Sequence, residues 1–227
     1  MVQSSCSTKL IIHRRSKSRE NTSSGMSRRI THTRVYLHPA KTKDLPIQEV
    51  KAILRGADGL IARGGRTLLS KILKGSTEKK ILQLGLDRSP AYGFFQDLPT
   101  EQVLEKIDWL IKNYYLQYEY DGRLPLLVYT PKGWEIERET YAEELFRGFM
   151  QMIEEGQTEY DMAYLKDRNR GMILLLLDKL ETRGDKRFVQ LLRSWERVDY
   201  KKVRQRIQAV IRVIENRSQV PEDERTG

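Results

Sequence analysis

The chain has 227 residues, of which 39% are hydrophobic and 32% charged, enough for one ordinary core with a satellite or for two small domains. Its single cysteine, Cys6, excludes an intramolecular disulfide framework and a multi-cysteine zinc site. The longest apolar run, residues 172–177, falls well short of the roughly 20 residues that a membrane span needs, and residues 10–12 are too few for a signal peptide. We therefore expect a cytoplasmic protein.

The net charge of +10 is unevenly distributed along the chain. Residues 1–45 carry ten lysines and arginines against two acidic residues, so that the remainder has a net charge of only +2. Contact between the folded part and DNA must therefore come from local placement of charge and not from an overall field.

The first 45 residues divide into a tail and an arm. Residues 1–25, rich in Ser, Thr, Arg and Lys, show no hydrophobic periodicity and are expected to form a disordered basic tail that adds salt-sensitive affinity for DNA. Residues 26–45 form an N-terminal arm, in which Thr33–Leu37 alternates like a short strand.

Residues 46–137 read as four helices followed by a β-hairpin. Apolar residues recur at helical spacing in residues 47–54 and 68–73, and in a short third helix capped by Ser76 with Ile81, Leu82 and Leu84 inward. The strongest helix begins at Pro99, and two β-rich runs flank Asp121-Gly122. The last three helices and this wing predict a mainly α fold with a winged helix.

Residues 138–218 predict a small α-helical module, followed by a polar tail at 219–227. We expect helices at Glu139–Met152, Met172–Glu181, Lys186–Trp195 and Tyr200–Ile214. Residues 184–210 are similar to a single HEAT-type repeat. Because one repeat cannot bury its own apolar face, the module should dock on the winged helix or on a partner.

Three motifs in order, Ile72–Ser76, Leu84–Asp87 and Tyr92-Gly93, resemble the RQC (RecQ C-terminal) domain of RecQ-family helicases. The resemblance extends back to Ala52 and forward to Thr130, over roughly 90 residues. It implies a winged-helix domain that grips duplex DNA near a junction, with the wing and the helix N-termini replacing insertion of a helix into the groove.

The family's motor and zinc ligands have no counterpart in these motifs. Residues 64–67 and 74–77 lack the glycine-loop spacing that holds nucleotide phosphates, and one cysteine cannot replace the four zinc-binding cysteines that precede this domain in the helicases. We therefore expect a stand-alone RQC-like protein without the helicase motor, with no cofactor, no metal and no small-molecule substrate.

The sequence offers little for catalysis. The histidines His13, His32 and His38 all precede the expected core, which excludes imidazole-based triads and metal sites there. Acidic clusters at residues 135–139 and 143–144 could hold Mg²⁺ in a nuclease, but such runs are far more often solvated helix faces. We expect no enzyme.

The long helix from Pro99 has outward positions at Glu101, Glu105 and Asp108. Carboxylates there would repel phosphates, which disfavours base reading by this helix. The tryptophans Trp109, Trp134 and Trp195 are interpreted as core or domain-seam residues.

Basic residues gather instead around the second and third helices, where the helix entries at residues 63–66 and 76–80 could expose backbone N–H groups to phosphate. In the wing, Tyr118 and Tyr120 could stack on a terminal base pair, worth about 1–3 kcal/mol per base, or pack on the domain. Alternatively, these basic side chains are scattered over the solvated surface and form no binding site. The predicted DNA-binding set is Arg63, Arg66, Lys71, Lys74, Ser76, Lys79, Lys80, Arg88, Ser89, Tyr92, Tyr120 and Arg123.

These observations predict a non-catalytic protein that recognises DNA structure, namely duplex ends, forks or junctions, in repair, recombination or replication near the nucleoid. The helical module would dock a helicase or repair protein. Two alternatives stay open: a protein-interaction adaptor for such an enzyme, favoured by the acidic helix face, and a winged-helix transcription regulator, which would need a palindromic site and a dimer.

Overall fold

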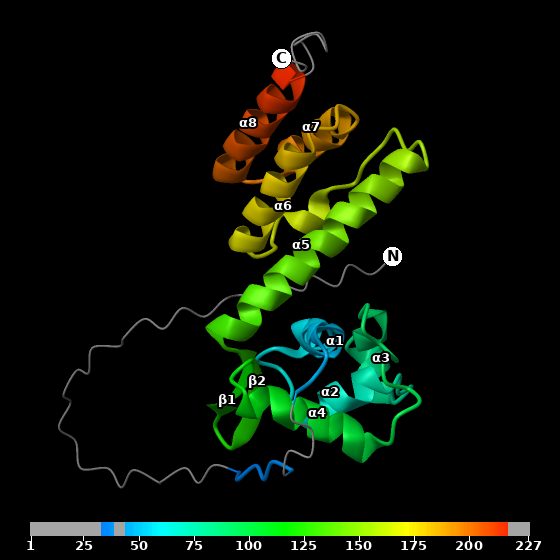
Figure 1. Cartoon of the computed structure of the whole chain (residues 1–227), viewed down its shortest axis with the longest axis vertical. Coiled ribbons are helices and arrows are strands. Elements are labelled where there is room, and N and C mark those ends of the chain that lie inside the picture. The colour runs from blue at the N-terminus through cyan, green and yellow to red at the C-terminus, as the bar shows by residue number, and fades with distance from the viewer. Residues whose placement is uncertain (1–32, 39–43, 218–227) are drawn as a thin grey trace, which may run out of the picture. The chain divides into compact units, whose positions relative to one another are not determined.

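The computed structural model describes residues 33–38 and 44–217 (Figure 1). The chain divides into two compact units between Glu135 and Ile136. Within the described ranges, no helix is long and apolar enough to cross a membrane.

The first unit contains four helices and a hairpin: α1 (Ile47–Ala57), α2 (Arg66–Leu73), α3 (Lys79–Gln83), α4 (Thr100–Lys112), β1 (Leu116–Asp121) and β2 (Leu124–Tyr129). Short 3₁₀ turns lie at Asp58–Leu60 and Leu86–Arg88. The predicted order of helices followed by a wing is confirmed, as is the mainly α fold class.

The core of this unit is built by α1, α2 and α4, and not by the last three helices as expected. Its fully buried side chains include Ile53, Leu69, Ile72, Ile107 and Leu110. Helix α3 is only five residues long and contributes Ile81 alone, because little more than one turn cannot turn several residues inward.

Two details of α3 differ from the prediction. Leu82 and Leu84, expected inward, are 50% and 40% exposed. The helix begins after Glu78, so Ser76 lies outside it. The Ser76 hydroxyl accepts the Glu78 N–H at 3.3 Å in a local turn, and none of the described side chains caps α3.

The glycines of the RQC-like motifs hold the exit of α2 against the turn that precedes α4. Gly75 and Gly93 both adopt positive φ (72° and 74°), and a Cβ on Gly75 would lie 3.2 Å from the Gly93 Cα. Hydrogen bonds from the N–H groups of Gly93 and Phe95 to the carbonyls of Ile72 (3.0 Å) and Leu73 (2.8 Å) close this contact. Glycine is required here by both conformation and space.

The antiparallel wing pairs Asp121 with Leu124, which leaves Gly122 and Arg123 as a two-residue turn. Gly122 takes positive φ (57°), as the first position of such a turn favours. Residues 33–37, expected to be a strand, are not one: the Thr33 N–H donates to the Arg123 carbonyl at 3.3 Å, but a single hydrogen bond does not make a ladder.

Helix α5 (Pro131–Glu154) begins eight residues before the predicted Glu139. Proline is favoured at the first position of a helix, and the Thr130 hydroxyl accepts the Gly133 N–H at 3.2 Å as an N-cap. Residues up to Glu135 belong to the first unit and the remainder of the helix to the second.

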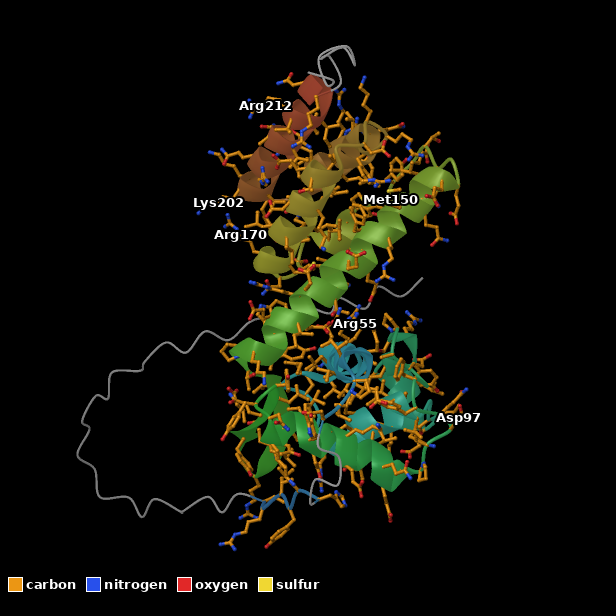
Figure 2. All side chains as sticks on the ribbon, viewed as in Figure 1. Arg55, Asp97, Met150, Arg170, Lys202 and Arg212 are labelled. Atoms are coloured by element: carbon orange, nitrogen blue, oxygen red, sulfur yellow. The ribbon has the colours of Figure 1, made fainter. Side chains whose placement is uncertain are left out.

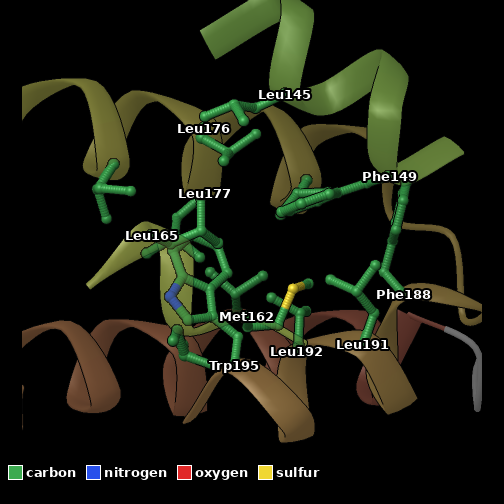
Figure 3. Packing of buried hydrophobic residues seen from close by; sticks show 14 of the residues in the cluster. Leu145, Phe149, Met162, Leu165, Leu176, Leu177, Phe188, Leu191, Leu192 and Trp195 are labelled. Carbon is green, nitrogen blue, oxygen red and sulfur yellow. The ribbon is translucent and has the colours of Figure 1, made fainter. Parts of the chain in front are cut away.

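The second unit contains the rest of α5, a 3₁₀ turn at Ala163–Leu165, and the helices α6 (Arg170–Arg183), α7 (Phe188–Val198) and α8 (Lys201–Arg217). Its core is shown in Figure 3, where Phe149 of α5 meets Trp195 of α7 edge-on at a ring distance of 5.9 Å. The α7–α8 pair thus buries its apolar face within its own unit. The HEAT-type resemblance stays a prediction.

Candidate nucleic-acid interface

The Gly64-Gly65 segment fixes the N-terminus of α2 against the wing. The Ala62 N–H donates to the Leu127 carbonyl and the Leu127 N–H to the Gly64 carbonyl, both at 2.9 Å. A Cβ on Gly65 would lie 3.1 Å from the Pro125 carbonyl oxygen, so the segment must stay small for this approach. As a result, the N-terminus of α2 is held against strand β2.

A groove of about 510 Å³ opens at this junction. It combines the N-terminus of α2, the start of α3, the base of the wing and the arm at residues 34–36. The lining residues are Arg34, Val35, Tyr36, Gly65, Arg66, Thr67, Leu68, Lys71, Glu78, Lys80, Tyr118 and Pro125. Four of them are basic and one is acidic, which gives the groove a positive balance suited to an anionic ligand.

The Arg66 side chain is held by the fold itself. Its guanidinium donates to both carboxylate oxygens of Asp108, to Oδ1 at 2.6 Å, and to the Tyr36 carbonyl at 2.9 Å. The Asp108 side chain is only 1% exposed and that of Arg66 18%. Since the paired carboxylate neutralises much of its charge, Arg66 positions the groove wall more than it supplies a free cation.

Asp108 was expected on the outward face of α4, and that expectation was wrong. The helix turns it towards α2 and the arm, where it also accepts hydrogen bonds from the His38 N–H at 2.7 Å and lies 2.9 Å from His38 Nδ1. His38 is therefore part of the folded unit, contrary to the expectation that every histidine precedes it. The acidic outward face of α4 shrinks to Glu101 and Glu105.

Four other members of the predicted set take part in hydrogen bonds of the fold. The Lys71 ammonium pairs with Glu78 at 2.7 Å, and the Lys74 ammonium donates to the carbonyls of Gln96 (2.7 Å) and Leu98. The Tyr92 hydroxyl donates to the Ser76 carbonyl at 3.1 Å. These side chains shape the α2–α3 region, and Lys71 also lines the groove.

Five predicted basic residues are exposed and form no ion pair among the described residues: Arg63, Lys79, Lys80, Arg88 and Arg123. Of these, Lys80 lines the groove, Lys79 is its neighbour, and Arg123 sits in the wing turn. Ser89, next to Arg88, accepts the Ala91 N–H at 3.3 Å through its hydroxyl. We refer to Arg63, Lys79, Lys80, Arg88 and Arg123 as the free basic set.

The wing separates its two tyrosines. Tyr118 lines the groove with its hydroxyl buried, whereas Tyr120 is 41% exposed and donates to the Thr33 carbonyl at 3.2 Å. Leu124, which the sequence argument did not single out, is 64% exposed beside the wing turn. Its position directly after the turn residues Gly122 and Arg123 was a signal that could have found it.

Burial raises the pKa of Tyr118 to about 12, partly offset by Arg66. Because the folded-state pKa lies above the unfolded value of 10.0, ionisation of Tyr118 leaves stability unaffected below pH 10, and the free energy of unfolding falls as the pH rises from 10 towards 12. We expect Tyr118→Phe to leave the free energy of unfolding at pH 7 unchanged or to raise it by up to about 1 kcal/mol, since it removes a buried hydroxyl that has no hydrogen-bond partner among the described residues.

Ultraviolet titration of the tyrosines checks this expectation. Tyr118→Phe should remove one late-titrating phenol, while Tyr120→Phe should leave the late phase intact. Loss of stability at pH 7 in Tyr118→Phe would show that the hydroxyl has a partner and would contradict the expectation.

The arm contributes groove residues that the predicted DNA-binding set did not include. Arg34 and Tyr36 line the groove, and Lys112 of α4 donates to the His38 carbonyl. Clusters of three or more potential metal ligands do not occur in the portion of the chain that the structure describes.

The helices, the two-stranded wing and the order in which they follow one another define a winged-helix domain. The family model of the RQC domain matches residues 39–145, which confirms the resemblance drawn from the motifs. RQC domains are DNA-binding winged helices found in RecQ helicases. No curated protein and no solved structure matches the chain.

Proposed function

We propose that the chain is a non-catalytic DNA-binding protein that recognises duplex ends, forks or junctions through phosphate contacts and its wing. The observation that carries the proposal is the free basic set on an RQC domain. Cations without a carboxylate partner are available to replace the counterions of DNA phosphates.

Recognition of structure in preference to sequence follows from the chemistry of α4 and the wing. Glu101 and Glu105 on the outward side of α4 disfavour its insertion into the major groove. The wing turn instead presents Tyr120 and Leu124, flat or apolar side chains that can cover a terminal base pair without reading it. Lys79, Lys80 and Arg88 would then hold the adjoining backbone.

Reversal of the charges in Lys79→Glu/Lys80→Glu/Arg88→Glu is expected to weaken binding at least tenfold. Each lost phosphate contact should lower the slope of log affinity against log salt by about 1, and hence by about 3 in total. The measurement is fluorescence anisotropy of the full chain with labelled duplex, forked and single-stranded DNA across a salt series.

The matched control, Lys79→Arg/Lys80→Arg/Arg88→Lys, keeps every charge and should bind as the unaltered chain does. A variant lacking residues 1–25 separates the contribution of the tail. Unchanged affinity and slope in the charge-reversed variant, or loss of all binding on removal of the tail, would refute the proposal.

A second candidate, an adaptor for a helicase or repair enzyme, is supported by one observation. Leu82 of α3, Leu84 directly after it and Phe94 in the segment before α4 are large apolar side chains that are exposed, and such exposure is typical of protein contacts when it is contiguous. An adaptor predicts that Leu82→Ser/Phe94→Ser impairs association with the partner enzyme and leaves DNA affinity unchanged. Involvement in repair, recombination or replication belongs to either candidate.

A further inference from the structure

Helix α8 carries a strong excess of positive charge. Its buried stripe, formed by Val203, Ile207, Val210, Ile211 and Ile214, faces the core of the second unit. Of its six basic residues, Arg206 pairs with Asp178 and Glu181, and Arg217 donates to the Glu181 carbonyl. The other four are exposed and form no ion pair among the described residues: Lys201, Lys202, Arg204 and Arg212.

A groove of about 680 Å³ runs between α7 and α8. Its lining residues are Arg193, Glu196, Arg197, Arg204, Gln208, Ile211 and Arg212. The two acidic groups nearby are already engaged: Glu196 accepts from Gln208 at 2.6 Å and Glu215 from Arg193 at 2.9 Å. Three arginines of the groove, Arg197, Arg204 and Arg212, therefore lack a carboxylate partner among the described residues.

The positive surface continues past the first turn of α8. Arg170, at the start of α6, lines a second depression together with Lys201 and Lys202. Figure 2 shows Arg170, Lys202 and Arg212 along the same edge of this unit. We call these residues the α8 basic face: Arg170, Arg197, Lys201, Lys202, Arg204 and Arg212. Asp167 and Asp199 also line the second depression, and they accept hydrogen bonds from Tyr200 and Trp195 respectively.

The extent of the face favours a polymer over a single small anion. Arg204 and Arg212 are eight residues apart on one helix, which corresponds to about 12 Å at the helical rise. The first turn of α8, the turn that carries Arg212 and the Arg197 turn of α7 each present a cation, an arrangement that suits a string of phosphates. Arginine guanidinium groups bind phosphate oxygens in pairs, with both geometry and charge complementary.

Other polyanionic partners fit less well. A membrane-surface helix inserts apolar side chains into the lipid, but Ile211 in this groove is 7% exposed and directed to the core. The chain also carries an RQC domain, so DNA held by that domain is at high effective concentration for any further basic surface on the same chain.

We propose that the α8 basic face is a second nucleic-acid contact, which binds the phosphate backbone without regard to sequence. It lies in a different unit from the winged helix and goes beyond the function proposed above. Its chemistry needs neither the wing nor the α2 groove.

The test is Arg204→Glu/Arg212→Glu in the full chain. Both side chains are exposed and form no ion pair with any described residue, so the fold should be retained. With labelled duplex DNA of about two helical turns and the matching single strand, affinity at low salt should fall at least tenfold. The slope of log affinity against log salt should fall by about 2.

The matched control is Arg147→Glu/Arg183→Glu, which makes the same change in net charge at two exposed arginines of the same unit outside the face. The control should lose much less affinity. Equal losses in both variants would mean a general effect of net charge and would overturn the proposal, as would affinity and slope unchanged from those of the unaltered chain. If circular dichroism shows loss of helix, Arg204→Gln/Arg212→Gln replaces the test variant, with an expected fall in slope of about 2.

The outcome is separable from that of the winged-helix proposal. If the Lys79/Lys80/Arg88 reversal has no effect while the Arg204/Arg212 reversal abolishes binding, the α8 face stands and the winged-helix proposal fails. If the Arg204/Arg212 reversal weakens binding to polyglutamate but not to DNA, the face is a site for acidic protein and the present proposal is wrong.

Discussion

Replacement of Gly133 by alanine is expected to destabilise the first unit by about 3 kcal/mol, although alanine is the better helix former. A Cβ at this position in the first turn of α5 would lie 1.9 Å from the Tyr115 carbonyl oxygen and 2.8 Å from its carbon. The obstacle is backbone, and Tyr115 is itself fixed because its carbonyl accepts hydrogen bonds from the Thr130 N–H and hydroxyl, both at 3.2 Å. The helix could relieve the overlap only by moving away from the wing.

Urea unfolding followed by circular dichroism measures this effect, with hydrogen exchange of peptides from β1 and β2 to locate it. Gly148→Ala in the same helix is the control, because a Cβ there meets nothing within 4 Å. It should raise the free energy of unfolding by about 0.5–1 kcal/mol through helix propensity alone. Opposite signs for the two substitutions are expected; a stabilising Gly133→Ala would mean that α5 does not pack on Tyr115.

Removal of the Asp108 carboxylate is expected to cost about 3–5 kcal/mol of stability, the typical result of leaving one half of a buried ion pair without its partner. In Asp108→Ala, the Arg66 guanidinium and the His38 N–H both lose their acceptor. Chemical denaturation, read out by hydrogen exchange of α2, α4 and the arm, checks the value. The exposed Glu101→Gln on the same helix should change stability by less than about 0.5 kcal/mol.

The double variant Arg66→Met/Asp108→Leu removes both charges of the ion pair and so distinguishes a role of Arg66 in the fold from a role in binding DNA. Replacing both partners by apolar side chains of similar size commonly restores stability, so we expect most of the loss to be recovered. If this variant keeps the DNA affinity of the unaltered chain, Arg66 acts by positioning; a tenfold loss would return it to the phosphate-binding set. A loss under about 1 kcal/mol in Asp108→Ala would contradict a structural role of the pair.

The sequence alone was sufficient to predict those helices and strands whose signal lies in neighbouring residues. Helix α4 was predicted from Pro99 because an apolar stripe follows that residue, and the hairpin was predicted from Asp121-Gly122 because its turn requires positive φ, which few residues other than glycine adopt readily. The start of α5 was missed by eight residues because its first turns are stabilised by Thr130 and by packing on Tyr115, neither of which has a periodic signature.

The candidate interface was less accessible to sequence reasoning. A count of charges cannot distinguish Arg66 from Lys80, since one is neutralised by Asp108 and the other is not, and that pairing joins residues 42 positions apart. Asp108 was placed outward by helical periodicity, but the arm covers that side of α4 through His38. Similarly, the near-neutral total for residues beyond 45 concealed the α8 basic face, because acidic residues elsewhere in the chain cancel its charge.

The docking of the arm bears on where a recombinant fragment of the domain should begin and end. The family match starts at residue 39, but Asp108 and Arg66 are completed by backbone groups of His38 and Tyr36. A fragment trimmed to the match would lack those groups, and its other boundary, residue 145, would cut α5 four residues before Phe149. Such a fragment would understate the stability of the natural domain, so expression boundaries should begin at or before Thr33 and end beyond α8.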